Sequence, residues 1–191
     1  SSDLHLFEFS LCLQEDELDN YLSVIDNVMI GLELYNYSYA RKKKKALKVL
    51  EEVGLLGIKD KKVSLLSGGE RKRVSLARAL AKEYNVLFLD EPLGPLHFEM
   101  RKKMMDLFER IAKTKLVIII AHNVKEIGED KNIIKLKDGR IVENNLVIND
   151  EKIGERSNVN RKKYSFSSIL INVLKLFKKR MKHFLFSSFS T

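Results

Sequence analysis

The sequence predicts an α/β protein with a mostly parallel sheet, because two short, continuous apolar runs alternate with segments of helical periodicity. The runs cover residues 86–89 and 116–120, and runs of this length are typical of strands buried on both faces. With 191 residues, 45% of them hydrophobic, the chain can form a core, which excludes a wholly disordered protein. Its single cysteine excludes an internal disulfide framework.

Each element is predicted from its own pattern, in chain order. Residues 6–13 alternate weakly and predict a strand, and residues 24–35 and 39–54 predict two helices. The basic run 41–45 is expected to be a solvated helix start. The remaining expectations are a helix over 71–83, strands over 86–89 and 116–120, a helix over 101–113 between them, and a hairpin over 132–143 that turns at Asp138-Gly139.

The net charge of +9 is unevenly distributed. Residues 151–191 carry ten basic and two acidic side chains, whereas the other 150 residues are nearly balanced. We therefore expect no nucleic-acid partner for the body of the chain and a membrane-surface contact for the basic tail. The predicted domains are 1–150, a linker over 151–160, and a basic amphipathic C-terminal helix within 161–191, too short in its apolar part to cross a bilayer.

Ser67-Gly68-Gly69-Glu70 stands directly before a helical pattern, and two interpretations fit it. A serine followed three residues later by a glutamate is a capping box, and that structural interpretation is favoured for the tetrapeptide alone. The same geometry also suits a phosphate, because glycines allow close approach and a helix N-terminus presents free N–H groups.

Polar residues follow each of the predicted strands. Asp90 and Glu91 come after the run 86–89, and His122 comes after the run 116–120. In α/β sheets the carboxyl edge is where ligands bind, and an aspartate in this place can hold Mg²⁺. Gln14 follows the first predicted strand. Taken singly, the two acids could be a solvated strand end and His122 a partly buried strand-end histidine, and Gln14 alone indicates no function.

Four motifs, taken in order, resemble those of the ATPase subunit of ABC transporters. They are Gln14, Leu66-Ser67-Gly68-Gly69-Glu70, Leu87-Phe88-Leu89-Asp90-Glu91-Pro92 and His122. The resemblance covers residues 6 to about 145 and implies a P-loop NTPase core with a helical subdomain. Residues 21–28 are similar to the lipoprotein-release and macrolide-exporter branch of that family.

The resemblance implies roles at the strand ends. Gln14 matches the glutamine that senses Mg²⁺ and the γ-phosphate, and Asp90 matches the Walker B magnesium ligand. Glu91 matches the general base, and His122 matches the switch histidine. The implied cofactors are ATP and Mg²⁺.

The resemblance also implies partners. Ser67, Gly68 and Gly69, with Glu70 after them, match the signature that closes on ATP held by a second ABC ATPase in a head-to-tail dimer. Such subunits power a membrane permease from the cytoplasmic face of the cell membrane. The tail over 161–191 resembles the entry of a permease in the same polypeptide; a basic segment that contacts RNA or anionic lipid, or that is disordered, is the alternative.

Two features depart from the family pattern. The sequence holds no Gly-x-x-x-x-Gly-Lys-[Ser/Thr], the phosphate loop that the family has before the Q-loop strand. After Walker B the sequence reads Gly94-Pro95-Leu96-His97, with His97 in place of the D-loop aspartate. We therefore expect a polypeptide truncated before the Q-loop that does not hydrolyse ATP alone. The alternative is a degenerate, non-catalytic subunit that donates its signature to a partner ATPase.

Overall fold

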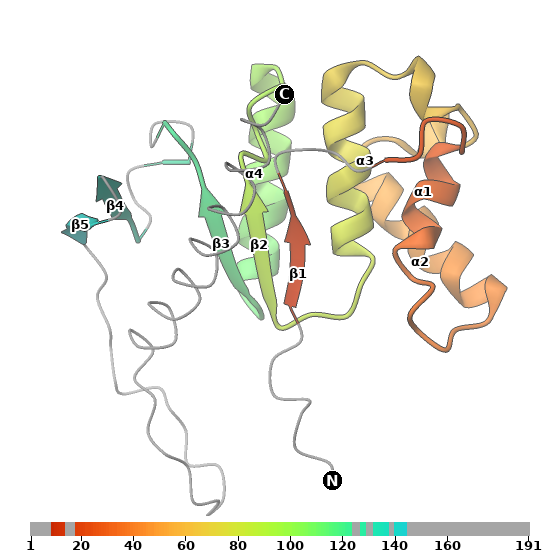
Figure 1. Ribbon diagram of the computed structural model, residues 1–191, viewed down its shortest axis with the longest axis horizontal. Coiled ribbons are helices and arrows are strands. Elements are labelled where there is room, and N and C mark those ends of the chain that lie inside the picture. Colours follow the sequence, from red (N-terminus) through yellow and green to blue (C-terminus); the bar gives the residue numbers. More distant parts are fainter. Residues whose placement is uncertain (1–8, 14–17, 124–126, 129–131, 138–139, 145–191) are drawn as a thin grey trace, which may run out of the picture. The chain divides into compact units, whose positions relative to one another are not determined.

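A parallel three-stranded sheet forms the centre of the computed structural model, which describes residues 9–13, 18–123, 127–128, 132–137 and 140–144. Its strands are β1 (Phe9–Cys12), β2 (Val86–Asp90) and β3 (Leu116–Ile120), in the order β1-β2-β3 (Figure 1). Both pairings are parallel, and Asp90 pairs with Ile120 at the carboxyl end. The predicted α/β class with a parallel sheet is confirmed.

In the described part of the chain, four α-helices accompany this sheet. The helices α1 (Val24–Ile30), α2 (Tyr39–Glu52) and α3 (Gly68–Leu80) pack against one another beside β1, and α4 (Phe98–Ala112) packs on β3 (Figure 1). Short 3₁₀ turns, Leu56–Ile58 and Val63–Leu65, join α2 to α3. The group α1–α3 corresponds to the predicted helical subdomain.

One hydrophobic core spans the sheet and the helices. Its fully buried side chains come from all of these layers, among them Val28, Leu50, Leu76, Leu87 and Phe108. Polar contacts add to this packing, because the hydroxyl of Ser10 on β1 donates to the carbonyl of Ala79 on α3 at 2.8 Å. The core therefore fixes α3, which follows the Ser-Gly-Gly-Glu motif, against the sheet.

Several helix boundaries differ from the prediction. The helix α3 begins at Gly68 rather than at 71, since Ser67 caps it and the glycines form its first turn. The helix α1 ends at Ile30 rather than at 35, and a Cβ on the next residue, Gly31, would lie 2.7 Å from Cγ of Arg78. A close approach of α1 to α3 therefore requires glycine at this position.

The expectation that β3 is buried on both faces is wrong. Leu116 is 37% exposed, and the other four residues of the strand are half-buried. β3 is more exposed than predicted because it is an edge strand in the described sheet. β2 lies between two neighbouring strands and has the buried centre that its apolar run predicts.

The basic run at the start of α2 is only partly solvated. Ser38 caps this helix, the Arg41 guanidinium lies 4.0 Å from the centre of the Tyr37 ring, and Lys42 pairs with Glu33 at 2.7 Å. A third member of the run, Lys45, pairs at 2.7 Å with Glu83, three residues after the end of α3. The prediction of a solvated helix start is therefore wrong for Lys42 and Lys45, which are partly buried, and holds for the exposed Arg41.

The predicted hairpin is present as β4 (Ile134–Lys137) and β5 (Arg140–Asn144), which pair antiparallel. Its turn, residues 138–139, lies outside the described residues, as do Gln14, the predicted linker 151–160 and the predicted amphipathic helix within 161–191. None of the helices in the described part of the chain has the length and apolar character needed to cross a bilayer.

Candidate functional site

The carboxyl ends of the three strands meet at one edge of the sheet. Because the strands are parallel and in register, Leu13, Asp90 and Ala121-His122 follow one another across this edge. The structure thus brings together the residues predicted at the ends of β2 and β3. Gln14, predicted at the end of β1, lies directly after the described residue Leu13.

Asp90 is the last residue of β2 and is half-buried. Burial, and then the neighbouring carboxylate of Glu91, raises the pKa of Asp90, while the charges of Lys72 and His122 act in the opposite direction. A nearby cation would stabilise the ionised form of such a carboxylate, because its charge offsets both the cost of desolvation and the repulsion from the second carboxylate.

Glu91 has an unusual backbone and a fixed side chain. Its φ is +46°, the left-handed region that side-chain-bearing residues rarely adopt. Its N–H donates to the carbonyl of Ile120 at 3.0 Å, and its Oε1 accepts a hydrogen bond from the backbone N–H of His122 at 2.7 Å. A side-chain-bearing residue in this region costs about 1–2 kcal/mol, and such strain concentrates at functional sites.

The His122 ring lies above this carboxylate in the open. Its Nε2 is 3.6 Å from Oε1 of Glu91, and its side chain is 93% exposed, against 17% for Glu91. The imidazole is therefore accessible to a ligand, while the Glu91 carboxylate is partly buried and held by the backbone N–H of His122.

Lys72 is a site residue that sequence reasoning missed. Its side chain is 3% exposed, and its ammonium donates to the carbonyls of Leu13 at 2.8 Å and Asp90 at 3.2 Å. One cation of α3 thus joins the ends of β1 and β2. Helical spacing could have indicated its burial, because position 72 lies four and seven residues before the buried Leu76 and Ala79 and therefore on the same face of α3.

The Ser67-Gly68-Gly69-Glu70 motif forms the predicted capping box. The N–H of Ser67 donates to Oε2 of Glu70 at 2.8 Å, and the N–H of Glu70 donates to Oγ of Ser67 at 3.3 Å. The hydrogen bond from the Ser67 N–H is also the main cause that lowers the pKa of Glu70. The structural interpretation of the motif is confirmed, and the phosphate interpretation uses the same geometry.

The two glycines of the motif have different surroundings. A Cβ on Gly69 would lie 3.0 Å from the carbonyl oxygen of Pro95, in the loop after β2. Nothing lies within 4 Å of the corresponding position on Gly68, which therefore faces open space. Within the described residues, no hydrogen bond or ion pair joins residues 67–70 to Asp90, Glu91 or His122. The site thus consists of two separate clusters.

The donor atoms at the strand ends fit Mg²⁺ better than a transition metal. Among the described residues, no group of three or more histidine, cysteine or acidic side chains could hold a metal ion alone. Mg²⁺ is usually held by one or two carboxylates together with waters and phosphate oxygens. Asp90, half-buried and next to a second carboxylate, suits that mode of binding.

Comparison with known proteins gives matches from one family. Residues 4–94 match the family model described as ABC transporter. Over 143 residues the chain is 36% identical to the taurine import ATP-binding protein of Pseudomonas entomophila, covering 71% of this chain and 54% of that protein. It is also 36% identical, over 141 residues, to the spermidine/putrescine import ATP-binding protein of Spiroplasma citri, covering 72% of this chain and 40% of that protein. The chain thus spans about half the length of the curated relatives it matches.

Solved structures agree with this result. The structure resembles a dimeric ATP-binding cassette in a post-hydrolysis state with ADP and Pi, with a TM-score of 0.66 and 28% identity over 72% of this chain and 62% of that chain. A dimeric bacterial ABC transporter cassette gives a TM-score of 0.64 at 30% identity, over 71% of this chain and 61% of that chain. Family model, relatives and fold coincide, and the matched segment of this chain resembles an ABC transporter ATP-binding domain.

Proposed function

We propose that the chain is an ATP-binding and ATP-hydrolysing part of an ABC transporter, and that it helps to power transport across a membrane. The observation that carries this proposal is the cluster of Asp90, Glu91 and His122 at the carboxyl edge of the sheet. Two acids and a histidine at that edge match the place where α/β folds bind ligands.

In this proposal Asp90, together with Gln14, holds Mg²⁺, and the bound ion would neutralise charge on the ATP phosphates. Glu91 acts as the general base, because its carboxylate is fixed by the His122 N–H at 2.7 Å and by its own strained backbone. His122, whose ring is exposed, contacts the γ-phosphate.

The signature motif serves a second ATPase in a head-to-tail dimer. Ser67, Gly68 and Gly69 meet ATP held by that partner, a role supported by the open space at Gly68 and by the N-terminus of the 13-residue helix α3. Glu70 takes part by fixing Ser67, since its carboxylate oxygen accepts hydrogen bonds from both the N–H and the hydroxyl of that residue.

A groove of about 290 Å³ between β1, α1 and α3 is a suitable surface for the permease. Its apolar side chains include Leu13, Ile30 and Leu34, which are 42%, 47% and 99% exposed. Arg78 and Lys82 also line it, none of its lining residues is acidic, and burial followed by the Arg78 charge lowers the pKa of Lys82. We infer that a permease segment with apolar and acidic side chains docks here.

The remaining predictions concern the rest of the chain and its setting. The domain boundaries at 150 and 160, the permease entry in the tail and a place on the cytoplasmic face of the membrane belong to the proposal. The exporter branch that residues 21–28 predict stays a prediction, whereas the two relatives described above are named for import.

A second candidate function is a non-catalytic subunit that only donates its signature. It is favoured by the missing Gly-x-x-x-x-Gly-Lys-[Ser/Thr] sequence and by His97, which precedes α4 without forming a side-chain cap. In either case we expect no ATP hydrolysis by this chain alone.

Nucleotide binding separates the two candidates. The full chain is titrated with a fluorescent, non-hydrolysable ATP analogue, with and without Mg²⁺, and compared with Asp90→Asn. Asp106→Asn is the matched control, because the same change falls on an exposed residue of α4. The first candidate predicts Mg²⁺-dependent binding that Asp90→Asn weakens at least about ten-fold, or about 1.4 kcal/mol, and Asp106→Asn leaves unchanged. Absence of Mg²⁺-dependent binding contradicts it and favours the signature donor.

A further inference from the structure

A pocket of about 260 Å³ lies near the amino ends of β2 and β3, whereas Asp90 stands at the carboxyl end of β2. It is formed by α2, the end of α3 and the turn between α4 and β3, and Tyr84 and Lys115 enter it just before β2 and β3 begin. The residues that line it are Lys45, Lys48, Val49, Glu52, Leu80, Ala81, Tyr84, Ile111, Thr114 and Lys115.

The pocket has an apolar floor and a basic rim. Val49, Leu80 and Ala81 are buried beneath it. Three ammonium groups stand around it against a single carboxylate, Glu52, so the lining has a net positive charge. A concave surface with apolar walls and a few polar groups is the usual form of a small-molecule site.

Several polar groups of the lining are available to a ligand. Within the described part of the chain, no hydrogen bond or ion pair is found for the ammonium of Lys48 or for the hydroxyl of Tyr84. Burial, followed by the charge of Glu52, raises the pKa of Tyr84 to about 12, so this hydroxyl keeps its proton at neutral pH and can donate. The ammonium of Lys115 donates to Oδ1 of Asn85 at 3.4 Å, a long contact.

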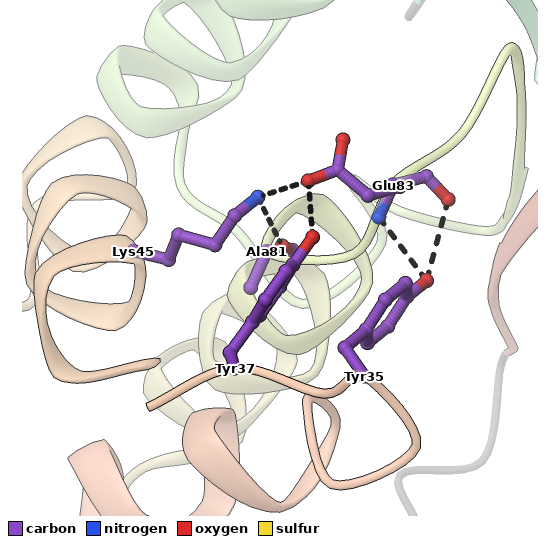
Figure 2. Close-up of polar contacts among 5 residues, drawn as sticks. All are labelled: Tyr35, Tyr37, Lys45, Ala81 and Glu83. Carbon is purple, nitrogen blue, oxygen red and sulfur yellow. Dashed lines mark hydrogen bonds and ion pairs between the residues drawn. The ribbon is translucent and has the colours of Figure 1, made fainter. Parts of the chain in front are cut away.

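Lys45 connects this pocket to a neighbouring polar cluster, which we call the Glu83 latch: Tyr35, Tyr37, Lys45 and Glu83 (Figure 2). Oε1 of Glu83 accepts from the Tyr37 hydroxyl at 2.6 Å and pairs with the Lys45 ammonium at 2.7 Å. The N–H of Glu83 donates to the Tyr35 hydroxyl at 3.1 Å, and the two tyrosine rings stack at 5.3 Å. The latch thus ties α2 and the loop before it to the residues after α3.

We propose that this pocket binds a small organic anion with a compact apolar body, such as an aromatic phosphate or carboxylate. The body rests on Val49 and Leu80, and the anionic group pairs with Lys48 and Lys45. Charge complementarity and the available donors carry this assignment, which does not rest on the proposed ATPase function. Because Lys45 is shared, the bound anion competes with the Glu83 carboxylate and loosens the latch.

Phenyl phosphate is the probe, because it combines one aromatic ring with a dianionic group. It is titrated into the full chain labelled with ¹⁵N, and backbone amide shifts of Lys48, Tyr84 and Thr114 are followed. Inorganic phosphate lacks the apolar body and benzyl alcohol lacks the charge, so each should bind at least about ten-fold more weakly. Shifts that map away from these three residues, or equal binding of all three compounds, would overturn the proposal.

Variants with opposite expected effects complete the test. Lys48→Glu should weaken phenyl phosphate binding by about ten-fold or more, whereas Glu83→Gln, which removes the competing carboxylate, should strengthen it. Both side chains are partly or largely exposed, and the dispersion of the amide spectrum shows whether each variant is folded. Lys103→Glu, the same charge change on an exposed residue of α4, is the control and should not alter binding. Equal loss in Lys103→Glu and Lys48→Glu, or weaker binding in Glu83→Gln, contradicts the assignment.

Discussion

Replacing Glu91 with glycine should destabilise the fold less than replacing it with alanine, the reverse of the usual order. The reason is the backbone of Glu91, whose φ is +46°. A side-chain-bearing residue in this left-handed region costs about 1–2 kcal/mol, whereas glycine tolerates it and costs about 0.5–1 kcal/mol through its greater freedom in the unfolded chain. Both variants lose the hydrogen bond from His122, so the difference of about 0.5–1 kcal/mol isolates the backbone strain.

Urea unfolding followed by circular dichroism measures this difference. With a slope of about 2 kcal/mol per molar urea, the midpoint for Glu91→Gly should lie roughly 0.25–0.5 M above that for Glu91→Ala. Glu91→Gln keeps an acceptor for the His122 N–H and should stay nearest to the parent chain. If the alanine variant equals or exceeds the glycine variant in stability, the assignment of a strained, left-handed Glu91 is refuted.

Three further changes test the packing around the site. Gly31→Ala should destabilise by about 1–3 kcal/mol, because its methyl group would lie 2.7 Å from a side chain of α3, whereas Gly57→Ala, in open space, should be neutral or stabilising in the same urea assay. Gly69→Ala should lower the melting temperature, because its Cβ would meet a carbonyl oxygen at 3.0 Å, and Gly68→Ala should not. Hydrogen bonds from Lys45 and then Tyr37 lower the pKa of Glu83. Its carboxylate therefore stabilises the fold at pH values above its ordinary pKa, and this contribution is lost as the pH falls through the lower pKa of the folded state. Glu83→Gln should remove this dependence and flatten the profile of stability against pH measured between about pH 6 and about pH 3.

The sheet could be predicted because its signal is local. A continuous apolar run such as residues 86–89 needs burial on both faces, and alternation with helical segments favours parallel pairing, which the structure confirms. The partial exposure of β3 could not be predicted from the same signal, because an apolar run does not show whether its strand lies at the edge of the sheet. The early start of α3 was missed because two glycines have poor helix propensity, which the Ser67 cap outweighs.

The candidate site was predictable only in part. Acids and a histidine after parallel strands must meet at one edge, so the placement of Asp90, Glu91 and His122 follows from topology. The positive φ of Glu91 could not be foreseen, because glutamate rarely adopts it and only the surrounding contacts impose it. Lys72 was missed because a lysine within a helix is usually solvated, and the carbonyls that it binds lie 59 and 18 positions away.

The Glu83 latch was missed for the same reason. The hydrogen bonds between Glu83 and its two tyrosines join residues 46 and 48 positions apart, and the basic run at the start of α2 has the composition of a solvated helix face. Only the folded arrangement shows that Lys45 of that run pairs with Glu83, three residues after the end of α3.

Metal placement tests the central claim, a Mg²⁺–nucleotide site at Asp90, most directly. Mn²⁺ is added in place of Mg²⁺ to the ¹⁵N-labelled chain with a non-hydrolysable ATP analogue, and paramagnetic broadening of each amide resonance is measured. We expect broadening centred on Asp90, Glu91 and His122 that disappears in Asp90→Asn and persists in Asp106→Asn. Broadening centred elsewhere, or unchanged in Asp90→Asn, would show that the metal–nucleotide site does not lie at Asp90.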